Sequence, residues 1–157
     1  MQFSDLLQAI RENQIKLVDG ILHAQPDWAN KTDERGSAPL ILASYYGHVE
    51  LTQLILNHGA NIDLQDAAGN TALMGVCFKG HNKVAKLLID KGAQVNLRNK
   101  AGGSALTYCA TFHNEEVAKW LLSAGAETDV KDNRGLTPAD HAKMQGQISF
   151  AKMLEKN

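Results

Sequence analysis

Several classes of protein are excluded by what this sequence of 157 residues lacks. Its apolar runs are far too short to cross a bilayer, and residues 1–5 lack the basic segment that begins a signal peptide. Its net charge of −1 provides no general attraction to nucleic acid or anionic lipid. We therefore expect a cytoplasmic protein that does not associate with membranes.

Common catalytic motifs are also missing. The sequence has no Gly-x-Ser-x-Gly, no phosphate-binding loop ending in Gly-Lys-Ser or Gly-Lys-Thr, and no His-Glu-x-x-His. Asp129, Asp132 and Asp140 are better explained as turn caps than as an acidic cluster, because aspartate in turns commonly accepts hydrogen bonds from backbone N–H groups. We expect neither enzymatic activity nor a bound cofactor.

What the sequence does contain is a regular repeat with a step of 33 residues. Glycine recurs at this step in two series and leucine in a third: Gly36, Gly69, Gly102 and Gly135; Gly59, Gly92 and Gly125; Leu40, Leu73 and Leu106. A fixed step in this range indicates one structural unit stacked on copies of itself. The sequence therefore predicts a short solenoid, whose function we expect on a repeated surface rather than in a deep pocket.

One copy of the repeat shows what the unit contains. Asp66 and Gly69 predict a turn, and Thr71 is a suitable N-cap for a helix that ends at Gly80. The segment 81–90 has the apolar spacing of a second helix, and a glycine follows its end. The predicted unit is a finger-like turn followed by two helices joined by a second turn.

This unit resembles the ankyrin repeat. The likeness is carried by the segments Gly47-His48-Val49-Glu50, 57–63, 91–96 and 133–139, and it covers nearly all of the chain. It implies an all-α solenoid of stacked helix-turn-helix repeats with β-turn or hairpin fingers. We expect one domain with full repeats at 33–65, 66–98 and 99–131 between capping repeats at 1–32 and 132–157. Polar residues in both caps predict a complete, monomeric protein.

The sequence departs from the family pattern in two ways. No copy keeps the histidine of the Thr-Pro-Leu-His motif, which puts in doubt the hydrogen bonds that this residue makes between repeats. His113 stands where other copies have glycine, and we expect it to adopt a left-handed backbone conformation. The resemblance also places Asn96 at a position where ankyrin-like repeats can be hydroxylated.

The cysteines and histidines predict no disulfide and no metal site. Cys77 and Cys109 fall at core positions of neighbouring first helices, so we expect buried free thiols. His48 and His81 share one repeat position and are expected to hydrogen-bond nearby backbone. His23 has no companion cysteine or carboxylate at a useful spacing, and no ligand spacing is found for the remaining histidines, which are His58, His113 and His141.

The positions that vary between copies are where function is expected. In ankyrin-like units, the finger tips and the inner face of the first helix line a concave groove. Four of the nine aromatic residues fall at these positions: Tyr45, Tyr46, Phe78 and Phe112. They would be core residues if the helix register slipped by one position, but Tyr108, Trp120 and Phe150 are better core candidates. The same surface carries six basic residues against the acidic Glu12 and Glu34: Arg35, Lys79, Arg98, Lys100, Lys131 and Arg134. The alternative explanation of these charges is ordinary solvated surface, where lysine is common.

These features predict that the groove binds a protein or peptide with apolar and acidic features, and that the chain acts as a scaffold, adaptor or stoichiometric inhibitor. The resemblance to ankyrin repeats points the same way. One alternative is association with nucleic acid through the basic fingers, which would make binding fall steeply with salt. Another is a small-molecule or catalytic role in the groove, which an open surface suits poorly.

Overall fold

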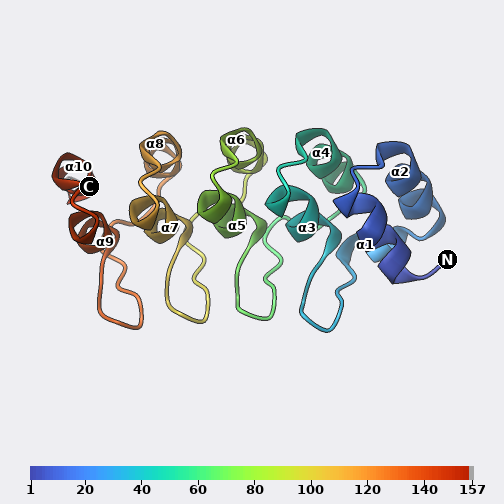
Figure 1. The fold of residues 1–157 in the computed structure, drawn as a ribbon, viewed down its shortest axis with the longest axis horizontal. Coiled ribbons are helices and arrows are strands. Elements are labelled where there is room, and N and C mark those ends of the chain that lie inside the picture. The colour runs from blue at the N-terminus through green and yellow to red at the C-terminus, as the bar shows by residue number, and fades with distance from the viewer. Residues whose placement is uncertain (156–157) are drawn as a thin grey trace.

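A computed structural model describes residues 1–155, which form ten α-helices and one 3-10 helix without any β-strand in that range (Figure 1). The helices are α1 (Phe3–Arg11), α2 (Ile15–Ala24), η1 (Pro26–Asn30), α3 (Pro39–Tyr45), α4 (Val49–Asn57), α5 (Ala72–Lys79), α6 (Asn82–Asp90), α7 (Ala105–Thr111), α8 (Glu115–Ser123), α9 (Pro138–Met144) and α10 (Ile148–Glu155). None of the helices in this range combines the length and the apolar character needed to cross a membrane.

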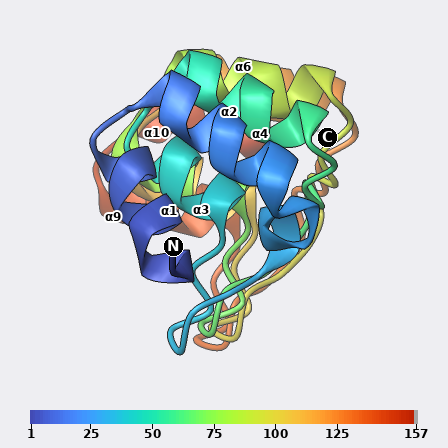
Figure 2. The same cartoon turned by 90° about the vertical axis from the view of Figure 1, so that its right-hand side faces the viewer.

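The helices lie in two layers along a solenoid. The odd-numbered helices α1 to α9 form an inner layer in which consecutive members pack against each other. Helices α2, α4, α6 and α8 do the same in an outer layer, and α10 packs on α9. The loops that precede α3, α5, α7 and α9 project together to one side as fingers (Figure 2). The predicted all-α solenoid of stacked helix pairs is therefore confirmed.

The helix ends follow the signals in the sequence. Thr71 caps α5, because its Oγ1 accepts a hydrogen bond from the N–H of Met74 at 3.2 Å. Gly80 ends α5 in a left-handed conformation, with φ of 80°. His113 has φ of 53° at the equivalent turn, as predicted, and Asn13 has φ of 56° before α2. The turn between the two helices of a pair thus keeps one conformation even where glycine is replaced.

Each finger is a turn closed by an acidic or amide side chain at its base. Asp66 Oδ1 accepts hydrogen bonds from the N–H groups of Ala68 and Asn70, both at 2.9 Å. Asp33 and Asp132 close their own fingers in the same way, as Asn99 does with Gly103. Neighbouring fingers are joined by backbone hydrogen bonds, such as the one from Lys100 N–H to the carbonyl oxygen of Ala68 at 3.0 Å.

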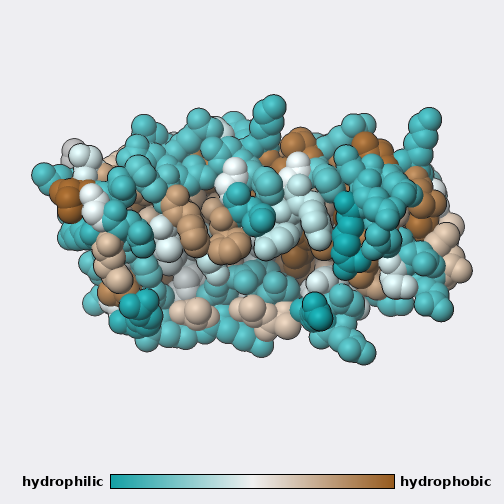
Figure 3. Space-filling model, in the orientation of Figure 1, coloured by the Kyte–Doolittle hydropathy of each residue, from teal (hydrophilic) through white to brown (hydrophobic). Residues whose placement is uncertain are grey.

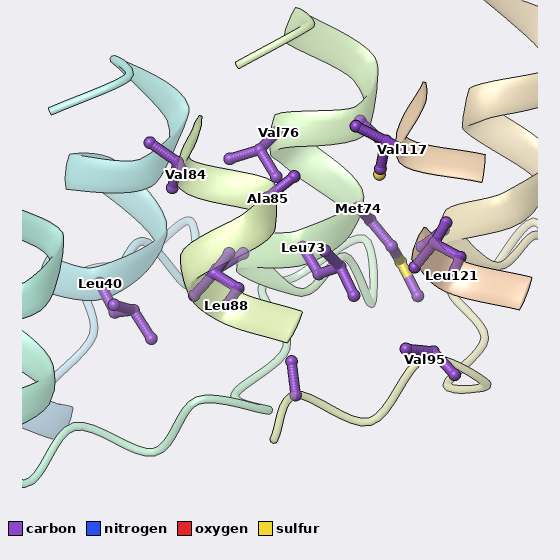
Figure 4. Packing of buried hydrophobic residues seen from close by; sticks show 14 of the residues in the cluster. Leu40, Leu73, Met74, Val76, Val84, Ala85, Leu88, Val95, Val117 and Leu121 are labelled. Atoms are coloured by element: carbon purple, nitrogen blue, oxygen red, sulfur yellow. The ribbon is translucent and has the colours of Figure 1, made fainter. Parts of the chain in front are cut away.

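One apolar core runs through the stack. Leu40, Leu73 and Leu106 are at most 2% exposed, and side chains of α3, α5, α6 and α8 meet between the two layers (Figure 4). Phe150 is buried, as expected. Tyr108 and Trp120 are only half-buried, so their prediction as core residues was wrong in part.

Both cysteines are free and buried, as predicted. The hydrogen bond with the Cys109 thiol, together with burial, raises the pKa of Cys77 well above its usual value. Because the thiolate is the nucleophilic form, the raised pKa disfavours reaction at Cys77 in the folded protein.

The histidines at the start of the outer helices tie consecutive helix pairs together. The ring Nε2 of His81 lies 3.0 Å from the carbonyl oxygen of Tyr45, and that of His48 lies 3.4 Å from the carbonyl oxygen of Arg11. The expected bonds to backbone are present, and the carbonyl belongs to the preceding helix pair in both cases. These bonds link neighbouring repeats in a chain that lacks the family's motif histidine.

Candidate functional site

The four aromatic side chains predicted for the groove all lie at the surface. Tyr45, Tyr46, Phe78 and Phe112 are 40%, 46%, 44% and 49% exposed. They occupy the C-terminal ends of α3, α5 and α7, and the stacking of these helices places equivalent ends beside each other. We call these four residues the aromatic face. Figure 3 shows apolar atoms across the middle of an otherwise mostly hydrophilic side of the molecule.

The aromatic face consists of two groups of rings in edge-to-face contact. Phe78 lies between Phe112 and Tyr108, with ring centroids 5.1 Å and 6.2 Å away and interplanar angles of 89° and 84°. Tyr45 and Tyr46 form the other group, with centroids 6.1 Å apart. Lys79 places its Nζ 5.2 Å from the centroid of the Tyr45 ring, within the range of a cation–π interaction. The rings therefore hold one another in defined orientations.

A shallow pocket separates the two groups. Tyr45 of one group and Phe78 and Tyr108 of the other line it, and the remaining lining residues are Ile41, Asp66, Asn70, Thr71, Met74 and Gly75. Gly75 is inside α5, where glycine costs roughly 0.5–1 kcal/mol relative to alanine. A Cβ at this position would meet only Tyr45 Cδ1, at 3.7 Å. The missing side chain therefore leaves open space, which we call the Gly75 pocket.

Tyr108 lines this pocket, although its position in the sequence predicted a core residue. Its hydroxyl donates to Asn70 Oδ1 at 3.2 Å and accepts from Asn99 Nδ2 at 3.0 Å. The ring thus forms a wall of the pocket while its hydroxyl is fixed to the fingers. The equivalent positions in the neighbouring copies hold Gly75 and His141, and this lack of a uniformly apolar pattern was the signal that could have identified it.

All six basic residues of the predicted site are exposed: Arg35, Lys79, Arg98, Lys100, Lys131 and Arg134. Arg98 differs from the others because its guanidinium donates to the carbonyl oxygens of Gly102 and Lys131, so it links two fingers. Gln65, one repeat earlier, makes the equivalent pair of bonds. Within residues 1–155, the finger residues Arg35, Lys100, Lys131 and Arg134 form no ion pair.

The last finger is connected to its helix by a pair of half-buried side chains. His141 Nε2 donates to Asp132 Oδ2 at 2.7 Å, and the two side chains are 13% and 10% exposed. Burial alone would raise the pKa of Asp132. Hydrogen bonds from the N–H of Leu136, from His141 and from the N–H of Arg134 outweigh it, so the pKa lies below its usual value of 3.8. This carboxylate is therefore ionised at neutral pH.

The prediction that His23 has no companion carboxylate was wrong. Asp19, one helical turn earlier in α2, places its Oδ1 3.3 Å from His23 Nδ1. The same oxygen lies 2.7 Å from Nε2 of His58, which directly follows α4. Asp19 and His23 are four positions apart, and this spacing in a predicted helix was enough to place the two side chains next to each other. The approach of His58 depends on the packing of α2 against α4, so no local pattern showed it.

These features define a class of protein: a helical repeat solenoid with an aromatic surface on its inner helices. A family model described as ankyrin repeats in three copies matches residues 6–99, and one described as ankyrin repeats in many copies matches residues 108–155. The chain belongs to the ankyrin repeat family. Ankyrin repeats are generally protein–protein interaction modules, and their fold is known as a non-enzymatic one.

One curated relative is similar to part of the chain. That relative is the mouse (Mus musculus) protein named ankyrin repeat and SAM domain-containing protein 6. The two sequences are 40% identical over 63 residues, which are 40% of this chain. The match spans only 7% of that protein's length, so it supports the family and no more specific role.

Proposed function

We propose that the chain binds a segment of another protein on its aromatic face, and that an apolar side chain of that partner enters the Gly75 pocket. The observation that carries this proposal is the set of four large, exposed aromatic side chains, which form two pairs of touching rings on neighbouring helices. Contiguous exposed apolar surface of this kind marks interaction sites, and aromatic residues are frequent among the residues that dominate binding energy. The open space above Gly75 supplies the pocket that such an anchor requires.

The charges around this face favour a partner with acidic residues beside its apolar anchor. Lys79 lies over Tyr45, and Arg35, Lys100, Lys131 and Arg134 are exposed along the fingers. Charges at the rim of an interface act mainly on the rate of association and on specificity. In this proposal the aromatic rings provide the affinity and the basic fingers orient the partner, as in a scaffold, adaptor or stoichiometric inhibitor.

The experiment compares capture of partners by four forms of the full chain. The wild type is set beside a Tyr45→Ala/Phe78→Ala/Phe112→Ala variant, a Gly75→Leu variant that fills the pocket, and a Val49→Ala/Ile148→Ala control. The control truncates exposed apolar residues of the outer helices α4 and α10. Each protein is immobilised, incubated with lysate of the source organism and analysed by mass spectrometry, and circular dichroism checks that it is folded.

We expect a protein that the wild type and the control capture and that both site variants lose. Truncation of an aromatic anchor typically costs about 2 kcal/mol or more of binding free energy, so the triple variant should lose affinity by far more than tenfold. Equal capture by wild type and by the folded triple variant would place binding elsewhere on the molecule and reject the proposal.

A further inference from the structure

A cluster of two histidines and a carboxylate lies at the first interface of the outer layer, away from the aromatic face. Asp19 and His23 are one turn apart on α2, and His58 directly follows α4. Each residue offers one ligand atom, and these atoms all lie within 4.8 Å of one another. The rings of His23 and His58 are perpendicular, with their centroids 4.8 Å apart.

We propose that Asp19, His23 and His58 bind a divalent transition-metal ion, with Zn²⁺ as the best fit. Imidazole nitrogen suits zinc, copper and nickel, and two imidazoles with one carboxylate are a ligand set that zinc accepts. Bonds of about 2.0–2.2 Å in a tetrahedron place ligand atoms roughly 3.3–3.6 Å apart. The separation of 3.3 Å between Asp19 Oδ1 and His23 Nδ1 is at the lower end of this range.

Small movements complete the site. The Asp19–His58 distance of 2.7 Å is that of a hydrogen bond, and it must widen by roughly 0.6–0.9 Å when an ion replaces the shared proton. His23 Nδ1 also lies 2.9 Å from the carbonyl oxygen of Asp19, so its ring must turn from that oxygen toward the ion. The His23 side chain is 71% exposed, which leaves it free to turn, whereas His58 is 15% exposed and held in place.

The equivalent positions at the next two interfaces carry a different chemistry. The left-handed residues Asn13, Gly47 and Gly80 precede α2, α4 and α6 and give a common starting point for comparing these helices. Counted from them, the positions of Asp19 and His23 correspond to Gln53 and Asn57 in α4, which share a hydrogen bond. In α6 they correspond to Lys86 and Asp90, which form an ion pair. No other set of three such ligands lies close together in residues 1–155. The metal-binding combination is therefore specific to the first interface and is not a general feature of the repeat.

Binding would join α2 of the first helix pair to the end of α4 in the second. Three protein ligands leave a fourth position for water, so we expect a single ion to bind. Because the unfolded chain does not hold these ligands together, saturating Zn²⁺ should also raise the melting temperature, by roughly 5 °C. This inference does not rest on the proposed function, since it uses none of the residues of the aromatic face.

The test uses the full chain without a histidine tag, after treatment with a chelator. Zn²⁺ binding is measured by isothermal titration calorimetry, and Co²⁺ is added separately because its visible absorption reports coordination by nitrogen ligands. We expect one equivalent of Zn²⁺ to bind, and each of His23→Ala, His58→Ala and Asp19→Asn to weaken binding by on the order of tenfold or more.

Two controls keep the result unambiguous. His113→Ala removes an exposed histidine that lies 3.6 Å from Glu115, and it should bind Zn²⁺ like the wild type. His23→Ala removes the most exposed of the three ligand side chains, so its effect should not arise from unfolding. Absence of binding at 100-fold excess Zn²⁺, or binding that His23→Ala and His58→Ala leave unchanged, would overturn the proposal.

Discussion

At the scale of single residues, the glycines of the fingers have two distinct roles. Gly69 has φ of 82°, a conformation that residues with a Cβ adopt at a cost. A Cβ at Gly69 would also lie 2.9 Å from the backbone nitrogen of Lys100 in the next finger. Gly135 has φ of 78° but nothing within 4 Å of its added Cβ. The close approach of the next finger is thus a separate requirement from the turn itself.

This difference predicts unequal costs for the same substitution. Gly135→Ala should lower the free energy of unfolding by about 1–2 kcal/mol, from the backbone conformation alone. Gly69→Ala should lower it by about 3 kcal/mol, because overpacking against the next finger adds to that cost. Urea denaturation of both variants followed by circular dichroism measures the two values. Equal losses would contradict the separate role of the next finger.

At the scale of elements, the junction between the last finger and α9 depends on one carboxylate. Asp132 accepts hydrogen bonds from the N–H groups of Arg134 and Leu136 within the finger and from His141 within α9. The folded structure lowers the pKa of Asp132 below 3.8. This group therefore stabilises the fold fully above its ordinary pKa, and the contribution is lost as the pH falls through the lower pKa of the folded state.

Asp132→Asn should consequently destabilise the protein by about 1 kcal/mol at neutral pH. The difference in free energy of unfolding between variant and wild type should shrink as the pH falls below 3.8. Urea titrations at pH 7, 5 and 3 measure this dependence. Asp129→Asn, at an exposed position, is the matched control and should change stability little at any of these values. A difference that stays constant with pH would contradict the role of ionised Asp132.

At the scale of the whole molecule, the two proposed sites use different parts of one stack. The aromatic face lies on the inner helices α3, α5 and α7, and the Asp19–His23–His58 cluster joins the outer helices at the start of the chain. Basic residues are exposed along the fingers while the whole chain has a net charge of −1. The surface is therefore locally basic without being generally attractive to polyanions.

This arrangement predicts a modest salt dependence for the binding of a partner. If aromatic contacts dominate, the Kd measured by titration should rise less than about tenfold between 50 and 200 mM NaCl. A nucleic acid held by six to ten phosphate contacts would instead lose roughly a thousandfold or more in affinity over this range. A loss of that size would favour the nucleic-acid alternative over the proposed protein partner.

Much of the architecture was predictable because it depends on short-range chemistry that recurs. The N-cap at Thr71, the left-handed turns at Gly80 and His113, and the finger turn closed by Asp66 each involve residues within five positions of one another. The exposure of Phe78 and Phe112 also followed from their positions in the repeat. Tyr108 was misplaced because its half-buried position is decided by its contacts with Asn70 and Phe78.

The amino-acid sequence alone determined the repeat, its helices and turns, and the family, because a 33-residue step repeats the same local signals along the chain. Only the tertiary structure decided which side chains meet across repeats. The Gly75 pocket requires Tyr45 and Tyr108 from the two neighbouring helices, and the Asp19–His23–His58 cluster requires a residue 39 positions away from Asp19. Such contacts depend on the distance and angle between stacked helices, which no local pattern in the sequence encodes.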